Sequence, residues 1–324
     1  MSARPGRMLD LEISVGWGIN AGGVGAVQWD TYTLPVGLRH VAWTDNALLI
    51  NHRPFYFLGV ARHEDSNIRG KGLDLPLLLR DQHLMEWLGV NSFRTSHYPY
   101  AEETLQLADR RGMVVISECA AVSLSGFGEQ LLANHLQAME ELVTRDRNHP
   151  SVVMWSIANE PKSYESAAGP YFAEVSAQTR ALDPSRPLTL AQLGYPDDYL
   201  LDQAAQYVDI ISVNKYFGWY TDPGHTELVH RQMATDLRRW REAHGKPLLV
   251  TEYGADTVAG LHSLPSLSWT EEFQGEFMAE YWGAFDEVRA EGWFLGEMVW
   301  NFADFMTKQE VRRVAGNRKG LFTR

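Results

Sequence analysis

The sequence is almost without cysteine. Its single thiol, Cys119, excludes an intrachain disulfide and any metal site built from several cysteines. Because Cys119 follows the apolar run of residues 113–116, we interpret it as a buried structural thiol. His63, Glu64 and Asp65 offer metal-ligating groups, but three consecutive residues at a strand end cannot all point to one ion. We therefore predict no metal site.

Long apolar runs and a basic surface are also absent. No stretch approaches the roughly 20 apolar residues that span a bilayer, and the charged first residues lack the apolar run of a signal peptide. We therefore expect a cytoplasmic protein that does not enter a membrane. The 29 basic residues are outnumbered by 41 acidic ones, which argues against nucleic-acid binding. An anionic substrate would need a local basic clamp.

What the chain does contain is a regular alternation of strand and helix patterns from residue 55 onward. Predicted strands cover residues 55–60, 91–94, 113–116, 152–158, 188–191, 208–214, 247–254 and 293–300. Predicted helices cover residues 73–88, 101–111, 131–147, 171–182, 227–244 and 271–291. This α/β order predicts a TIM (β/α)8 barrel. An open doubly wound sheet is the alternative, but no Gly-rich phosphate loop follows the first strand.

The ends of the chain depart from a complete barrel with its own N-terminal domain. Residues 9–50 carry short β-type segments that are too few to close a sandwich. We interpret residues 1–50 as the remnant of a preceding β domain with a linker, and residues 51–324 as a catalytic barrel. No pattern for a last outer helix follows residue 300, so we expect the outer faces of the first and eighth strands to be exposed.

Two of the apolar strands end abruptly in a glutamate. Residues 152–158 lead into Asn159 and Glu160, and residues 247–251 lead into Glu252. Barrel enzymes carry their catalytic groups at the C-terminal ends of the strands. Glycoside hydrolysis needs two carboxyl groups, one as acid and one as nucleophile or base. Either glutamate alone is equally well explained as a polar strand end, but the matched pair favours catalysis.

Three further clusters are expected at the same rim. His97 follows the second strand, with Arg94 just inside it, although a lone histidine is more often structural. Residues 214–220 combine aromatic rings with polar groups, a mixture suited to binding a sugar. The alternative is that these residues form an apolar cluster under a loop. Residues 300–305 precede a basic run at 312–319, which suits an anion after the eighth strand. Such a run also commonly decorates a solvated surface.

Together these stretches resemble glycoside hydrolase family 2, and within it the β-glucuronidases, from about residue 31 to residue 324. The segments that carry the resemblance are residues 55–57, 63–65, 69–72, 95–103, 148–161, 214–220, 251–254, 300–305 and 317–324. Runs of this length in this order are specific to the family. Chance similarity among barrels would not produce them.

The resemblance implies hydrolysis of β-D-glucuronides with retention of configuration and without a metal or cofactor. It matches Glu160 to the acid/base and Glu252 to the nucleophile, whose carboxyl groups lie about 5–5.5 Å apart in retaining enzymes. Asn159 matches the ligand of the sugar 2-hydroxyl. Asn317 and Lys319 match the pair that binds the glucuronate carboxylate. Other matched sugar-pocket positions are His97, Asn214, Tyr216, Tyr220, Trp300 and Arg313.

The resemblance also suggests partners and leaves alternatives. Expected substrates are small-molecule glucuronide conjugates or glucuronate-ended oligosaccharides, and a homo-oligomer is expected from the family. Family members carry a sugar-binding domain and an immunoglobulin-like domain before the barrel, and this chain matches only the tail of the second. A truncated barrel that is inactive or only binds sugar is therefore one alternative. A β-galactosidase-type glycosidase is another, disfavoured by Asn317 and Lys319.

Overall fold

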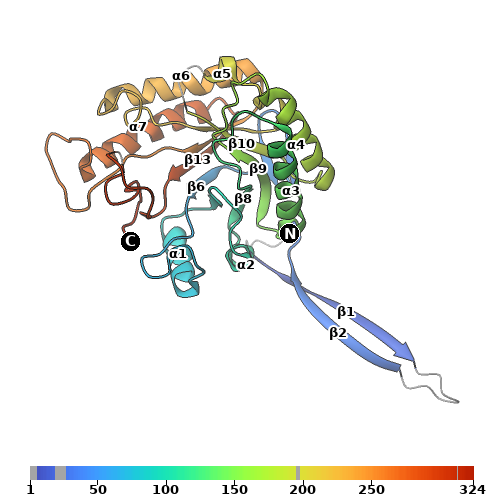
Figure 1. Cartoon of the computed structure of the whole chain (residues 1–324). Helices are drawn as coiled ribbons and strands as arrows, with labels where there is room; N and C mark the ends of the chain where they lie inside the picture. The colour runs from blue at the N-terminus through green and yellow to red at the C-terminus, as the bar shows by residue number, and fades with distance from the viewer. Residues whose placement is uncertain (1–5, 19–26, 195–197, 312) are drawn as a thin grey trace.

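The chain folds around a closed barrel of eight parallel strands (Figure 1). This computed structural model describes residues 6–18, 27–194, 198–311 and 313–324. The barrel strands follow one another in chain order, and the last pairs with the first. They are β6 (Phe57–Ala61), β7 (Ser92–Arg94), β8 (Val114–Glu118), β9 (Val152–Asn159), β10 (Leu188–Gln192), β11 (Ile211–Asn214), β12 (Leu248–Glu252) and β13 (Phe294–Trp300). The predicted TIM (β/α)8 barrel is confirmed.

Helices connect the strands and cover the outside of the barrel (Figure 1). They are α1 (Leu75–Trp87), α2 (Glu102–Arg111), α3 (Glu129–Asp146), α4 (Ala168–Leu182), α6 (Thr226–His244) and α7 (Glu271–Arg289), with the short α5 (Asp198–Leu201) and a 3-10 turn (Ala205–Tyr207) between β10 and β11. Their ends follow local chemistry. The Asp74 side chain accepts the Leu77 N–H at the start of α1, and Gly112 ends α2 at a φ of 73°, which favours glycine.

The barrel interior is a packed apolar core at its N-terminal end. Leu249, Met154 and Met298 are fully buried there and form one cluster with Val41 and Leu48. The last two belong to β3 (Val41–Trp43) and β4 (Leu48–Ile50), which form a small antiparallel sheet with β5 (Arg53–Pro54). This sheet therefore closes the end of the barrel opposite the predicted site, where packing serves stability.

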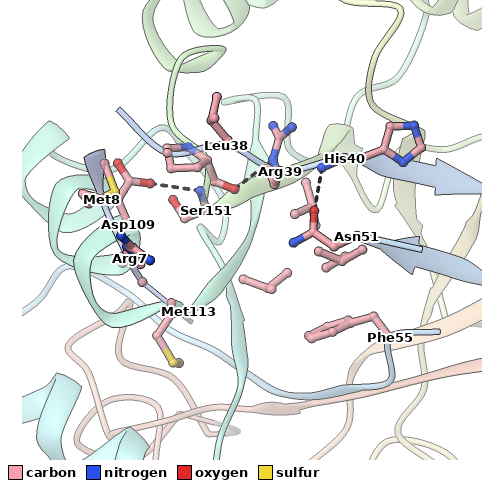
Figure 2. A pocket seen from close by; sticks show the side chains of 18 of the residues that line it. Arg7, Met8, Leu38, Arg39, His40, Asn51, Phe55, Asp109, Met113 and Ser151 are labelled. Carbon is pink, nitrogen blue, oxygen red and sulfur yellow. Dashed lines mark hydrogen bonds between the residues drawn. The ribbon is translucent and has the colours of Figure 1, made fainter. Parts of the chain in front are cut away.

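A cavity of about 840 Å³ lies at this same closed end (Figure 2). Leu38, Phe55 and Met113 contribute apolar walls, and Asp109 and Ser151 contribute polar ones. The Ser151 N–H donates to Asp109 at 2.9 Å. Because the cavity borders the beginnings of β8 and β9, it is separate from the rim where the predicted catalytic residues lie.

The first two strands form a separate two-stranded sheet. β1 (Leu9–Gly18) and β2 (Val27–Val36) pair as an antiparallel ribbon that extends away from the barrel (Figure 1). One face carries apolar pairs such as Leu11 opposite Leu34 and Ile13 opposite Tyr32, while Ser14 bonds to Thr31 on the other. The interpretation of residues 1–50 as a domain remnant and linker stays a prediction.

The expectation that the outer faces of the first and eighth strands are exposed holds at one residue. In β6, Leu58 is 44% exposed, but the other four residues of the strand are buried. In β13, however, every residue is buried, so that part of the expectation is wrong. The reason is that α7 covers β13: the Phe285 ring stacks on Phe294 with centroids 5.3 Å apart, and Tyr56 packs against the same ring.

The structure also bears on the predictions about Cys119 and about membrane-spanning segments. Cys119 is buried, as predicted, and burial raises the pKa of its thiol to about 12. No helix in the described part of the chain combines the length and the hydrophobicity that crossing a bilayer requires. The cellular location stays a prediction of the sequence.

We predict that Leu249→Ala lowers the free energy of unfolding by about 2–5 kcal/mol, because it leaves a void inside the barrel. Urea unfolding followed by circular dichroism measures the loss. The matched control is Leu200→Ala in α5, where the side chain is 68% exposed and the change should stay below about 0.5 kcal/mol. Equal losses from the two substitutions would contradict this account of the core.

Candidate active site

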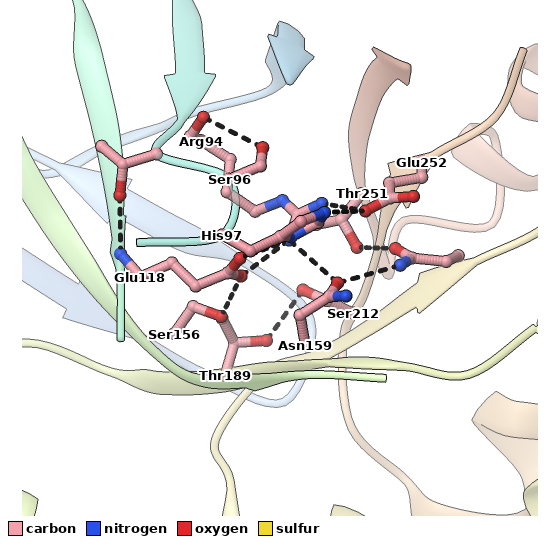
Figure 3. Close-up of polar contacts among 12 residues, drawn as sticks. Arg94, Ser96, His97, Glu118, Ser156, Asn159, Thr189, Ser212, Thr251 and Glu252 are labelled. Atoms are coloured by element: carbon pink, nitrogen blue, oxygen red, sulfur yellow. Dashed lines mark hydrogen bonds and ion pairs between the residues drawn. The ribbon is translucent and has the colours of Figure 1, made fainter. Parts of the chain in front are cut away.

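Parallel strands bring residues from distant parts of the sequence to one rim. Asn159, Asn214, Glu252 and Trp300 are the last residues of β9, β11, β12 and β13, and Glu160 follows Asn159 directly. Since all eight strands point the same way, their C-terminal ends surround one space. Figure 3 shows Arg94, His97 and Glu252 converging there through hydrogen bonds and ion pairs.

Glu252 is held by donors on both carboxylate oxygens. Its Oε1 forms an ion pair with Arg94 Nη2, and its Oε2 accepts a hydrogen bond from the Tyr216 hydroxyl at 2.6 Å. The residue is buried, at 4% exposure. Two donors on two oxygens fix the orientation of this carboxyl group.

Glu160 has the opposite environment. Desolvation of its carboxyl group raises the pKa to about 7, and the nearby charge of Glu252 adds to the shift. Its one side-chain hydrogen-bond partner in the part of the chain that the structure describes is the Asn214 amide, which donates to Oε1 at 3.0 Å. The backbone φ of Glu160 is 46°, a left-handed conformation that L-residues adopt at an energetic cost and that is frequent at active sites. A carboxyl group with this pKa can donate a proton near neutral pH.

A chain of hydrogen bonds fixes the two asparagines beside Glu160. The Thr251 hydroxyl donates to Asn214 Oδ1 at 2.8 Å, which leaves the Asn214 amino group to donate. That group faces both Glu160 and Asn159 Oδ1, the latter at 3.2 Å. Asn159 Oδ1 also lies 3.3 Å from Arg94 Nη1. The orientation of Asn214 is therefore set by a neighbour on the adjacent strand β12.

Rings form one wall of the site. The His97 ring stacks on Trp300 with centroids 5.0 Å apart and an interplanar angle of 12°. His63 packs edge-on against Trp300, so it is part of this wall. The centroid of the Tyr216 ring lies 4.9 Å from that of the Tyr220 ring, which connects the surroundings of Glu252 to the next group of residues. Stacked rings of this kind suit the apolar face of a sugar.

Lys319 and Asn317 supply a buried cationic corner. Lys319 forms an ion pair with Asp256, and its Nζ lies 3.0 Å from the Tyr220 hydroxyl. Burial lowers the pKa of Lys319 to about 8, although Asp256 opposes the shift. Asn317 is fully buried, and its Nδ2 has no hydrogen-bond partner among the described residues. A buried donor without a partner is suited to a ligand acceptor.

The predicted site residues fall into two connected groups. Glu160, Glu252, Asn159, Asn214 and Tyr216 contact one another directly or through Arg94. The second group joins Tyr220, Asn317 and Lys319. The His97 and Trp300 stack adjoins the first group through the 3.8 Å separation of His97 Nε2 and Glu252 Oε1.

Arg313 lies at the edge of the second group. It is half-buried, and burial raises the pKa of Tyr220 to about 12 while the charge of Arg313 opposes that shift. Its neighbour in the basic run, Arg312, lies outside the described residues. The predicted basic segment therefore reaches the site through Arg313 and Lys319.

Sequence reasoning missed three residues of this site. Glu118 ends β8 and pairs with Arg94, Asp256 pairs with Lys319, and Thr251 orients Asn214. One signal was available for Glu118, which ends the apolar run from residue 113 in the same way that Glu160 and Glu252 end theirs. No local pattern marks the other two.

Within the part of the chain that the structure describes, no three His, Cys, Asp or Glu side chains converge closely enough to hold a metal ion. The chemical groups at the rim include Glu160 and Glu252 in different environments, a ring-lined wall and a cationic corner. This set can perform acid/base and nucleophilic chemistry.

Comparisons with known proteins show which family this barrel resembles. The model of glycosyl hydrolases family 2, TIM barrel domain, matches residues 41–324. The chain is 50% identical to the beta-glucuronidase of Homo sapiens over 327 residues, which is 100% of this chain and 49% of that protein. It is 52% identical to that of Rattus norvegicus over 298 residues, 91% of this chain and 45% of the relative. The chain thus spans about half the length of these curated relatives.

Solved structures give the same result. The beta-D-glucuronidase of Dictyoglomus thermophilum superposes with a TM-score of 0.90 at 44% identity, covering 99% of this chain and 55% of that one. The Bifidobacterium dentium beta-glucuronidase, solved with coumarin-3-O-glucuronide, has a TM-score of 0.89 at 39% identity, covering 99% and 52%. With its barrel, its rim and these matches, the chain belongs to glycosyl hydrolase family 2 through the TIM barrel domain.

Proposed function

We propose that this barrel hydrolyses β-D-glucuronides with retention of configuration, releasing D-glucuronate and an alcohol. The observation that carries the proposal is the pair of rim glutamates in opposite environments, Glu252 held by Arg94 and Tyr216 and Glu160 with a pKa raised to about 7. The similarity to proteins named beta-glucuronidase supports the substrate class.

In the first step, Glu252 attacks the anomeric carbon as the bond to the aglycone oxygen breaks. Glu160 gives its proton to that oxygen, so the alcohol leaves neutral and the sugar stays covalently bound to Glu252. In the second step, the Glu160 carboxylate takes a proton from a water molecule, and the resulting hydroxide attacks the anomeric carbon and displaces Glu252. Two inversions give retention. Arg94 and Tyr216 hold the nucleophile in position throughout.

The cationic corner provides the proposed selectivity for glucuronate. A carboxylate on the sugar would accept from the unpartnered Asn317 Nδ2 and from Lys319 Nζ. In an acidic protein with a net charge of -12, this buried corner is the local clamp that an anionic substrate needs. Charged hydrogen bonds of this kind contribute about 1.5–3 kcal/mol each.

A second candidate is a barrel that binds glucuronides without turning them over. A β-galactosidase-type activity is disfavoured by Asn317 and Lys319, since a neutral sugar offers no carboxylate to them. Glucuronate-ended oligosaccharides as substrates, and the homo-oligomer expected from the family, stay predictions.

We predict that Glu252→Gln abolishes turnover of 4-nitrophenyl β-D-glucuronide, lowering kcat by more than about 10³-fold, because an amide cannot serve as the nucleophile. The amide oxygen can still accept from Arg94, and the Tyr216 hydroxyl can accept from the amide nitrogen, so the melting temperature should change little. Full activity in the variant would refute the role of Glu252. An inactive wild-type chain that still binds D-glucaro-1,5-lactone would instead support the binding-only candidate.

We predict that kcat/KM falls as the pH rises through about 7. Glu160 has a raised pKa of about 7, so it is protonated and able to donate below that pH and ionised above it. The pH dependence of kcat/KM, measured with a glucuronide that has a poor leaving group, shows this fall as the basic limb of the profile. In Glu160→Gln the limb should disappear together with most of the activity. A wild-type profile that is level from pH 6 to 9 would contradict the assignment.

We predict that Lys319→Met lowers the preference for glucuronide over galactoside by about 10- to 100-fold, because one charged contact to the sugar carboxylate is lost. The measure is the ratio of kcat/KM for the two 4-nitrophenyl glycosides. Arg318→Met is the matched control, since Arg318 is paired with Asp304 at 3.2 Å and is a third exposed. An unchanged ratio in Lys319→Met would remove the basis for naming the sugar.

A further inference from the structure

Glu118 is a fully buried carboxylate at the end of β8 that is not itself among the predicted site residues. Both of its oxygens lie within hydrogen-bond distance of Arg94 Nη1, at 2.9 and 2.7 Å. Its Oε1 is also 3.0 Å from His97 Nδ1, and its Oε2 accepts from the Ser156 hydroxyl at 2.7 Å. Figure 3 shows these contacts beside Glu252.

Arg94 connects this carboxylate to the nucleophile. One guanidinium nitrogen, Nη1, faces Glu118, and the other, Nη2, faces Glu252. The arginine is completely buried, so its single positive charge is shared between two carboxylates rather than with water. Burial alone would raise the pKa of Glu118, but Arg94 and His97 hold it below its ordinary value. Glu118 is therefore ionised at neutral pH.

His97 is oriented by the same carboxylate. An ionised carboxylate only accepts hydrogen bonds, so the contact at Nδ1 requires a proton on that nitrogen. The opposite nitrogen, Nε2, then faces Glu252 Oε1 at 3.8 Å. Stacking on Trp300 fixes the plane of the ring. Glu118 and Trp300 together thus determine that the Nε2 edge of His97 faces Glu252.

We propose that Glu118 is a positioning residue for the nucleophile, acting through Arg94 and His97. Its negative charge offsets part of the Arg94 charge, so Glu252 is oriented without losing its nucleophilic character. This inference rests on the proposed glycosidase function, since it assigns Glu252 as the nucleophile. A purely structural ion pair would require only one of these contacts, whereas Glu118 contacts both of the residues that face Glu252 Oε1.

The charge of Glu118 also affects the pKa of Glu160, through Arg94 and His97. The groups facing Glu118 are Arg94 and His97 from β7 and the turn after it, with the neutral Cys119 thiol next in the chain. Arg94 and His97 in turn act on Glu160 and lower its pKa, against desolvation and Glu252. Without the Glu118 charge, the Arg94 charge is no longer offset. Glu160 should then ionise at a lower pH.

The test compares Glu118→Gln, which removes the charge and keeps the shape, with the unaltered chain. We expect kcat/KM to fall by about 10²-fold, as for a misplaced catalytic group, and the basic limb of the pH profile to move down by about 0.5–1 pH unit. The matched control is Asp109→Asn, which removes a buried carboxylate paired with His149 at the other end of the barrel. It should leave both readouts unchanged.

A second measurement does not depend on turnover. With ¹³C-labelled glutamate, the carboxyl signal of Glu160, identified by its loss in Glu160→Gln, is titrated in both proteins. We expect its midpoint to fall by about 0.5–1 pH unit in Glu118→Gln. If Glu118→Gln does not fold, Glu118→Asp keeps the charge on a shorter side chain. We expect this variant to keep the midpoint while lowering kcat/KM, because Arg94 is displaced.

The outcomes separate this inference from the proposed function. An inactive wild-type chain would refute the proposed function, whereas the Glu160 titration would still decide whether Glu118 acts through Arg94. A Glu118→Gln variant with kcat/KM within about threefold of wild type and an unchanged Glu160 midpoint would overturn the inference and leave Glu118 as a structural ion pair. In the Asp variant, a Glu160 midpoint that shifts would equally overturn it.

Discussion

The closure of eight parallel strands is the constraint on which the rest of this structure depends. A parallel barrel with its strands in chain order places every strand end at one rim, so residues about a hundred positions apart, such as Glu160 and Glu252, meet without any local pattern linking them. Closure also separates two tasks. The N-terminal end is packed with apolar side chains and covered by the β3–β5 sheet, while the C-terminal rim is left to polar groups.

At that rim, the two glutamates that we propose as the catalytic pair have different surroundings. Glu252 accepts from Arg94 and Tyr216, whereas Glu160 has one neutral amide donor and the negative charge of Glu252 nearby. The donors around Glu252 fix the orientation of its carboxyl group, whereas desolvation and the charge of Glu252 raise the pKa of Glu160 to about 7. The difference arises from neighbours on other strands. Mutual repulsion of the two carboxylates strengthens it, since ionisation of one opposes ionisation of the other.

The buried charges of the site are organised in two ion-paired units rather than as isolated ions. Glu118, Arg94 and Glu252 form one unit, and Asp256 with Lys319 forms the other. Removing a charge from water is costly unless a partner compensates it, and Arg94 and Lys319 each have a carboxylate beside them. This arrangement keeps the cations in fixed positions while limiting how strongly they neutralise the groups they serve.

Much of this could be read from the sequence, because helix and strand periodicity and abrupt strand ends are local properties. The order of strands predicted the barrel, and the glutamates at two strand ends predicted the candidate pair. The buried state of β13, the pairing of Glu118 with Arg94 and the hold of Asp256 on Lys319 were decided only in three dimensions. Those contacts depend on how neighbouring strands and loops are registered around the closed barrel, and that register is a property of the whole fold rather than of any segment.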